Sequence, residues 1–200
     1  MKTELKAKFI QHILNKKKEN EGFTLIELLV VIIIIGILSA IALPSFLNQA
    51  NKAKQSEAKT IVGSMNRAQQ AYYLENGKFV FGTDDDSAAA FGQLGLGVKT
   101  KTENYQYGIV GTDKLVTNQA QRKDQATTPL KTYVGGVGVS VVSETSEATT
   151  VAVLCEAKVP GNVGDAADGT ETFANTDIKD DGTVAQCPGG NDGKYVSLAK

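Results

Sequence analysis

The most informative pattern in the chain is a long apolar run near its start. Residues 23–43 read FTLIELLVVIIIIGILSAIAL, and Glu27 is the only charged side chain in this run. With a rise of about 1.5 Å per residue, a helix over this run spans about 31 Å, which matches the hydrocarbon thickness of a bilayer. The pattern therefore predicts a membrane-spanning helix over residues 23–43.

A second, amphipathic helical pattern follows the apolar run. Between residues 46 and 74, apolar side chains recur at spacings of three and four within a segment rich in Ala, Lys, Gln and Glu. Gly77 supplies a helix stop, because glycine takes the left-handed conformation at little cost. An ordinary soluble helix would stop or kink at Pro44. If the helix continues past Pro44, residues 44–76 form its second half and pack one face on a globular domain.

The helical period disappears after Gly77, where glycine, threonine and valine take over. Residues 78–104 are expected to form a connecting loop with a short helix around Ser87–Phe91. Runs enriched in β-branched and aromatic residues predict three strands, Tyr105–Val110, Tyr133–Val142 and Thr149–Cys155. The simplest assembly is an antiparallel sheet. The predicted fold is α+β, with the long N-terminal helix packed on a sheet that forms a head over residues 77–200.

Two cysteines flank most of a polar tail. The tail, residues 156–193, is acidic and glycine-rich and is too polar to fold alone. Cys155 and Cys187 are too far apart for a CxxC motif, and a disulfide between them requires an oxidising compartment. The alternative is a pair of buried reduced thiols. A disulfide-closed loop of this length contributes roughly 3 to 4 kcal/mol, so we expect the disulfide, rather than packing, to hold the tail.

The net charge of −1 is unevenly distributed along the chain. Residues 1–22 carry six lysines and three glutamates, a balance of +3, which leaves −4 for the remainder. Because the basic flank precedes the apolar run, residues 1–22 are expected in the cytoplasm and residues 44–200 outside. A weakly acidic remainder with no basic run gives no electrostatic footprint for nucleic acid, so direct nucleic-acid binding is not supported.

Residues that could support catalysis are few. The single histidine, His12, lies near the start of the chain, which excludes a histidine base or a multi-histidine metal site from the rest. The glycines of Gly135–Gly138 do not continue into a phosphate-binding motif and are expected to mark a bulge in a strand. The carboxylates near residues 177–182 and 84–86 lack EF-hand spacing, so solvated loops are favoured over calcium sites. The sequence predicts no enzyme, no cofactor and no metal site.

A lysine-rich leader that ends in Gly22, followed by FTLIELLVVIIIIGILSAIALP, closely resembles the prepilin signature of type IV pilins and related pseudopilins. The signature is specific because it fixes a glycine, an aromatic residue, a glutamate and a proline at set spacing. The resemblance implies that a prepilin peptidase cuts between Gly22 and Phe23, removes residues 1–22, and methylates the new amine of Phe23. The later order of helix, antiparallel sheet and disulfide loop looks like the globular head of such pilins.

The resemblance also implies roles for three residues in the helix. A carboxylate in a transmembrane helix costs on the order of 2.5 to 3.5 kcal/mol at the centre and less near an end, so Glu27 needs a partner. In the family, the glutamate at this place attracts the N-terminal amine of a neighbouring subunit. The alternative is a carboxylate near the lipid headgroups, favoured by the helix dipole. The helix between Gly36 and Pro44 is expected to lose hydrogen bonds in a filament, or otherwise to kink at the proline.

The function implied by the resemblance is that of a structural subunit of a type IV pilus. The precursor would sit in the inner membrane and then polymerise through residues 23–43 into an extracellular filament for motility, adhesion or DNA uptake. The implied partners are identical or related subunits, the prepilin peptidase, the inner-membrane assembly machinery, and lipid before assembly. A minor pilin or type II secretion pseudopilin is the alternative within the superfamily. Outside it, Ala40–Ala42 resembles a secretory cleavage site, and a permanently anchored domain would keep its leader.

Overall fold

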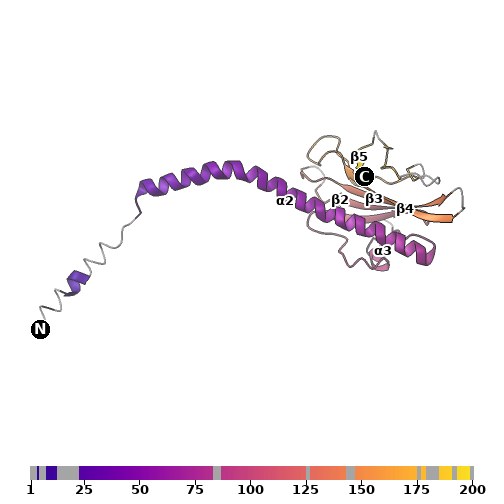
Figure 1. Ribbon diagram of the computed structural model, residues 1–200, viewed down its shortest axis with the longest axis horizontal. Helices are drawn as coiled ribbons and strands as arrows, with labels where there is room; N and C mark the ends of the chain where they lie inside the picture. Colours follow the sequence, from indigo (N-terminus) through magenta and orange to yellow (C-terminus); the bar gives the residue numbers. More distant parts are fainter. Residues whose placement is uncertain are drawn as a thin grey trace. The chain divides into compact units, whose positions relative to one another are not determined.

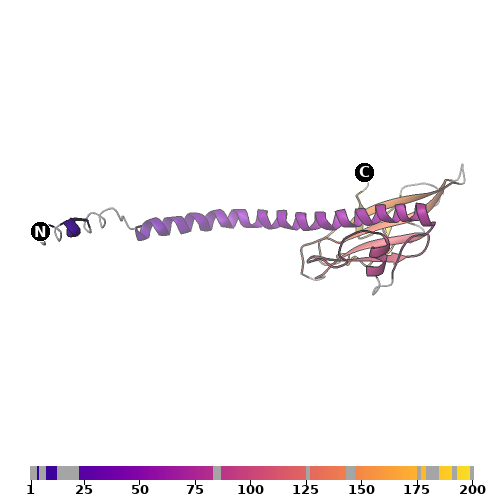
Figure 2. The ribbon, with the colours of Figure 1, turned by 90° about the horizontal axis from the view of Figure 1, so that it is seen from below.

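The computed structural model describes residues 4, 8–12, 23–82, 87–124, 127–142, 147–174, 177–178, 185–190 and 193–198. The chain divides into two compact units, Met1–Asn48 and Gln49–Lys200. The first unit contains the beginning of helix α2. The second unit contains the rest of α2, a short helix and a sheet (Figures 1 and 2).

Helix α2, Leu25–Asn76, confirms the predicted helix and starts two residues later than expected. It includes Pro44, so the helix does not stop at the proline. Gly77 adopts a φ of 69°, and its N–H donates to the Tyr73 carbonyl over 2.8 Å, as expected of a helix stop. Every side chain from residue 23 to residue 49 is exposed, and the first buried side chain of α2 is Ala58.

Within the described residues, five strands form one antiparallel sheet in the order β1-β2-β3-β4-β5. Their bounds are β1 Tyr105–Gly111, β2 Leu115–Arg122, β3 Tyr133–Val142, β4 Glu147–Ala157 and β5 Tyr195–Ser197. The three predicted strands are confirmed as β1, β3 and β4, and helix α3, Ser87–Gln93, confirms the short helix. Strands β2 and β5 were not predicted.

The sheet carries a separate hydrophobic core on each face. On one face, the second half of α2 lies along the sheet (Figure 2). It packs through Ala58, Val62 and Met65 against aromatic and aliphatic residues of β1, β2 and β3. On the other face, residues of the C-terminal tail pack against β3 and β4; the second cluster comprises Val134, Val153, Cys155, Ala157, Ala167, Phe173, Ile178, Ala185, Cys187 and Tyr195. The sheet is therefore the middle layer of three.

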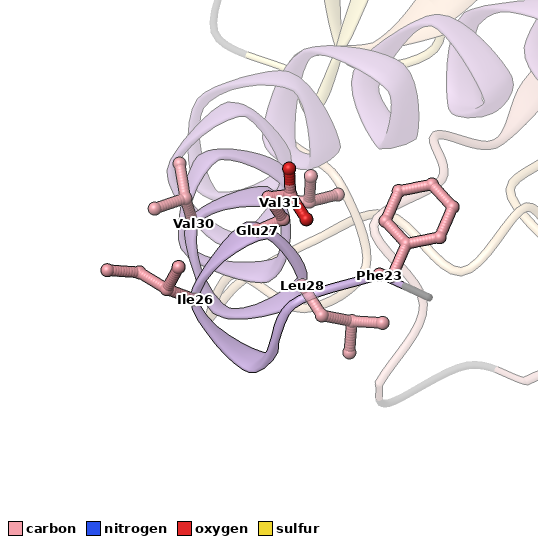
Figure 3. Close-up of a pocket in the computed structure, with 6 residues that line it drawn as sticks. All are labelled: Phe23, Ile26, Glu27, Leu28, Val30 and Val31. Carbon is pink, nitrogen blue, oxygen red and sulfur yellow. The ribbon is translucent and has the colours of Figure 1, made fainter. Parts of the chain in front are cut away.

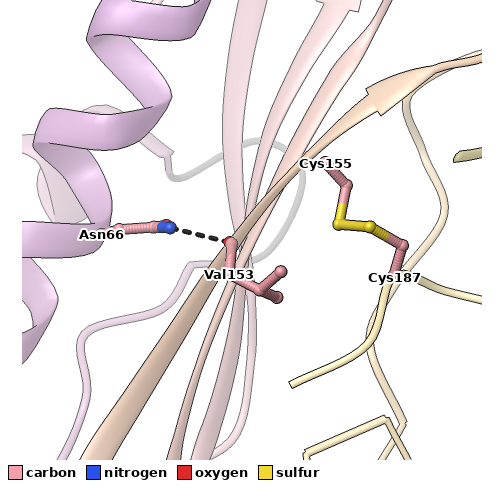
Figure 4. The surroundings of a disulfide bond; sticks show 4 residues. All are labelled: Asn66, Val153, Cys155 and Cys187. Carbon is pink, nitrogen blue, oxygen red and sulfur yellow. Dashed lines mark hydrogen bonds between the residues drawn. A yellow bond between two sulfur atoms is a disulfide. The ribbon is translucent and has the colours of Figure 1, made fainter. Parts of the chain in front are cut away.

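The predicted disulfide is confirmed, but the expectation that the tail is not packed is wrong. Cys155 and Cys187 are bonded, and both are buried (Figure 4). Between them, Phe173 and Ile178 are only 6% and 5% exposed, and they belong to the second core. A few apolar side chains are enough to pack a polar tail, because each of them is buried against the sheet.

The glycines of β3 do not form the predicted bulge. Strand β3 pairs with β4 residue by residue from Tyr133 to Val142. A methyl group at Gly135 would lie 2.7 Å from Val62 of α2, and one at Gly136 would lie 2.8 Å from the Phe173 ring. The glycines instead let α2 approach the sheet closely on one face and the tail on the other.

Candidate functional site

The start of α2 presents an apolar surface in the first compact unit. Large aliphatic side chains from Leu25 to Leu47 are between 43% and 82% exposed. By length and composition, α2 is the one helix among the described residues that could cross a membrane. An apolar surface of this length is stable only when lipid or protein covers it.

Thr24 and Glu27 form a reciprocal cap at the first turn of this helix. The main-chain N–H and the hydroxyl of Thr24 both donate to Glu27 Oε2 over 2.8 Å. In return, the Glu27 N–H donates to Thr24 Oγ1 over 3.3 Å. This is a capping box, in which a threonine before the helix and a glutamate three residues later satisfy each other's main-chain donors. The role of Thr24 was not predicted, although the T-x-x-E spacing before an apolar run is the known sequence signal of a capping box.

The cap leaves part of the Glu27 carboxylate available. Both hydrogen bonds to the carboxylate end on Oε2, and Oε1 accepts none from the described residues. The carboxylate lies in a shallow hollow whose other lining residues are all apolar: Phe23, Ile26, Leu28, Val30 and Val31 (Figure 3). Glu27 and Val31 project on the side of the helix where the Phe23 ring lies. Glu27 is exposed in the single chain, so a cationic group that reached Oε1 would meet one negative charge whose attraction strengthens only where lipid or packed helices exclude water.

The other predicted site residues are placed as follows. Gly36 and Pro44 both lie inside α2, and a methyl group at Gly36 would meet no atom within 4 Å. Local unwinding between them stays a prediction. Gly22 lies outside the described residues, whereas Phe23 is described and 86% exposed. The acidic runs at residues 84–86 and 179–182 also lie outside the described residues.

A carboxylate with no signal in the local sequence joins α2 to the sheet. Glu156 of β4 forms ion pairs with Lys59 of α2 over 2.7 Å and with Lys131 over 2.8 Å. The Tyr133 hydroxyl donates to the same carboxylate over 3.2 Å. Burial raises the pKa of Glu156, but the hydrogen bonds and charges of Lys131 and Lys59 outweigh it, so the pKa lies below its ordinary value of 4.5.

A buried amide network makes a second connection between α2 and the sheet. Asn66 Nδ2 donates to the Val153 carbonyl of β4 over 2.9 Å (Figure 4), and Asn118 Nδ2 of β2 donates to Asn66 Oδ1 over 2.8 Å. The Asn66 side chain passes over Gly135, where a Cβ atom would collide with Asn66 Oδ1. The network and the glycine together fix the position of this part of α2 on three neighbouring strands.

Comparison with known families gives two matches. The family of type IV pilin-like G and H proteins matches residues 55–188, and the prokaryotic N-terminal methylation motif matches residues 17–43. The first match covers more than half of the chain and includes most of the head. The second covers the apolar run and the Thr24–Glu27 cap.

Individual relatives resemble the chain over part of its length. The type IV major pilin protein PilA of Myxococcus xanthus (strain DK1622) is 48% identical over 60 residues, which are 30% of this chain and 27% of that protein. The type IV major pilin protein PilE1 of Neisseria gonorrhoeae is 46% identical over 59 residues, 30% of this chain and 36% of that protein. The type IV major fimbrial protein FimA of Dichelobacter nodosus is 35% identical over 100 residues, 42% and 64% of the two chains. The chain thus spans less than two thirds of the length of each of these relatives.

Proposed function

The chain belongs to the type IV pilin family, and on this premise we propose that it is cut after Gly22, methylated at the amine of Phe23 and polymerised through residues 23–43. Residues 1–22 would be the removed leader, residues 44–76 the amphipathic half of the same helix, and residues 77–200 the head. The precursor would be held in the inner membrane with its head outside. The mature chain would then be a subunit of an extracellular pilus.

The observation that carries this proposal is the fully exposed apolar stretch of α2. Each large aliphatic side chain in it gains roughly 1.5 to 3 kcal/mol when it is removed from water. Lipid covers such a stretch before assembly, and packed helices of neighbouring subunits cover it afterwards. An anchor that only held a domain at the membrane would have no use for a carboxylate within the stretch, whereas a polymerising helix uses Glu27 to select its neighbour.

The cap at the start of α2 supports a specific role for Glu27 in assembly. In the single chain, Thr24 satisfies one carboxylate oxygen, which lowers the cost of placing Glu27 at the membrane. The second oxygen would accept a hydrogen bond from the methylated, positively charged amine of Phe23 in a neighbouring subunit. Cleavage after Gly22 creates this amine, so an uncut chain would lack the positive partner and would not add to the filament.

The proposal is tested by mass spectrometry of protein sheared from the cell surface. The expected mature chain begins at Phe23 and carries one extra methyl group on its amine. A chain that begins at Leu43, or one that keeps residues 1–22, contradicts the proposal. Immunogold electron microscopy of the same filaments decides the class of subunit: label along the whole fibre indicates a major pilin, as the relatives are named, label at the tip a minor pilin, and unlabelled fibres a pseudopilin.

A further inference from the structure

Helix α2 begins just after the peptide bond that is proposed to be cut. Phe23 lies outside the helix and is 86% exposed. The first main-chain hydrogen bond of the helix runs from the Leu28 N–H to the Thr24 carbonyl over 3.3 Å. Thr24 is therefore the N-cap of α2, and the bond between Gly22 and Phe23 precedes it in the chain.

The sequence before the cap does not by itself fix this start. Residues 8–12 are helical. Residues 16–21 read KKKENE, and lysine and glutamate are good helix formers. The single glycine at position 22 weakens a helix but does not stop it. A helix that formed in the leader would therefore run on into α2 unless a local device ended α2 at Thr24.

The cap takes up two main-chain donors that a continued helix would need. In an α-helix, each N–H donates to the carbonyl four residues earlier. A helix continued into the leader would thus bond the Thr24 N–H to the Asn20 carbonyl and the Glu27 N–H to the Phe23 carbonyl. Instead, the Thr24 N–H donates to Glu27 Oε2 over 2.8 Å, and the Glu27 N–H donates to Thr24 Oγ1 over 3.3 Å. The cap and a helix through Phe23 exclude each other.

We propose that Thr24 is a positioning residue for cleavage of the bond between Gly22 and Phe23. In this step, water adds across the bond, so that Gly22 ends in a new carboxylate and Phe23 keeps the nitrogen as an amine. In a continued helix the Gly22 carbonyl would accept the Ile26 N–H, which shields it from the attacking water. The cap keeps the cleavable bond out of the helix. The inference rests on the proposed function, because it concerns the rate of the cleavage proposed there.

The Thr24 hydroxyl carries most of the cap. Two of the three hydrogen bonds between Thr24 and Glu27 pass through it. Loss of the hydroxyl should favour the continued helix about fivefold, which corresponds to about 1 kcal/mol. Because only the uncoiled form is cut, cleavage should slow by about two- to fivefold. The change should appear in KM rather than in kcat, since a smaller fraction of the chains is ready to bind the peptidase.

Timed cleavage of the full precursor by purified prepilin peptidase in detergent tests the inference. Thr24→Val keeps the branched shape and removes the hydroxyl, so its cleavage should slow by about two- to fivefold. Thr24→Ser changes the shape and keeps the hydroxyl, and its rate should stay within about 1.5-fold of the unchanged chain, because serine is an equally good N-cap. Ser39→Ala is the matched control, since it removes an exposed hydroxyl of α2 far from the cap and should leave the rate unchanged.

A second measurement separates positioning from direct recognition of residue 24 by the peptidase. The carbon chemical shifts of Phe23 in detergent micelles report whether the helix has grown past the cap. They should become more helical in Thr24→Val and stay as in the unchanged chain in Thr24→Ser. The change in conformation should be present before any peptidase is added.

Three results would overturn the inference. They are equal cleavage of Thr24→Val and the unchanged chain, normal cleavage of Thr24→Val with slow cleavage of Thr24→Ser, and slow cleavage of Thr24→Val while Phe23 stays outside the helix. The last two would show that the peptidase reads residue 24 directly. An unchanged chain that the peptidase does not cut after Gly22 would instead contradict the proposed function, so the two failures are distinct.

Discussion

Thr24 and Glu27 hydrogen-bond each other in both directions across the first turn of α2, and both bonds to the carboxylate end on the same oxygen, Oε2. Glu27 therefore has two separable properties. It caps its own helix through Oε2, and its carboxylate carries a negative charge and leaves the other oxygen, Oε1, available. Variants of the two residues can remove one property and keep the other.

We predict that Glu27→Gln lowers the yield of filaments at least about tenfold, while cleavage after Gly22 proceeds normally. Glutamine keeps the capping geometry but has no charge to attract an amine. The measurement is the amount of pilin in the sheared filament fraction relative to the mature pilin in the membrane.

Thr24→Ala is the matched control for this prediction. It removes the side-chain partner of the cap at a cost of about 1 kcal/mol and keeps the carboxylate charge. We expect its filament yield to stay within about twofold of the unchanged chain, since the charge survives. The reverse pattern, with normal yield from Glu27→Gln and loss from Thr24→Ala, would show that capping rather than charge is what assembly needs.

The parts of the fold with local signals were predicted well from the sequence. The apolar run, the amphipathic period and the stop at Gly77 are all encoded by neighbouring residues, and α2 follows them. Strand β2 has no such signal, because Asn118, Gln119 and Gln121 read as loop residues. In the folded chain these polar side chains face groups that need partners; Gln119 Nε2, for example, donates to the Thr170 carbonyl over 2.8 Å. Those partners come from distant segments, which no local pattern records.

The role of the glycines of β3 also could not be predicted from neighbouring residues. Glycine in a strand predicts a bulge, yet here the missing side chains make room for α2 and for the tail.

We predict that Gly136→Ala destabilises the head by about 1 to 3 kcal/mol, because its methyl group would press on the Phe173 ring. Denaturant unfolding measures the loss, and Phe173→Leu in the same chain should recover part of it.

Gly92 provides the control for Gly136. It lies in α3, and a methyl group there would meet no atom within 4 Å. Gly92→Ala should therefore not destabilise the head, since alanine is the better helix former. Equal losses from the two substitutions would refute the crowding at Gly136.

The amide network predicts a coupling between α2 and β2. Asn66→Ala would leave the Asn118 amide without its buried partner, at about 1 to 3 kcal/mol, and would remove the side-chain hydrogen bond to the Val153 carbonyl, which also faces β3 in the sheet. The double variant Asn66→Ala/Asn118→Ala should lose less stability than the sum of the losses in the two single variants. The measurement is a double-mutant cycle by denaturant unfolding, with Gln70→Ala, a half-buried position on the same helix, as the comparison. Strict additivity would show that the two asparagines do not act together.

The candidate site could be predicted only where it is contiguous in sequence. Residues from Gly22 to Glu27 form one local motif, and their roles in cleavage and assembly stay predictions. The Glu156 cluster could not be found in this way, because Lys59, Lys131 and Glu156 come from a helix, a loop and a strand far apart in the chain. Its members are ordinary charged residues until the fold brings them together.

The Glu156 cluster makes the attachment of α2 to the sheet sensitive to acid. The pKa of Glu156 is lower in the folded chain than its ordinary value of 4.5, chiefly because the hydrogen bonds from Lys131 and Lys59 outweigh the effect of burial. The folded state therefore holds this proton less tightly than the unfolded state. The stability that follows is fully present above a pH of about 4.5 and is lost as the pH falls through the folded pKa.

We predict that the urea midpoint of the head decreases when the pH is lowered from about 6 to about 3. Glu156→Gln should make this decrease smaller, because the variant has no carboxylate to protonate where α2 meets β4. Glu57→Gln, which changes an exposed carboxylate of helix α2, should keep the acid response of the unchanged chain. If Glu156→Gln and Glu57→Gln lose stability equally on acidification, the ion pairs of Glu156 do not help to hold α2 on the sheet, and that attachment rests on the buried core of α2 and the amide network of Asn66.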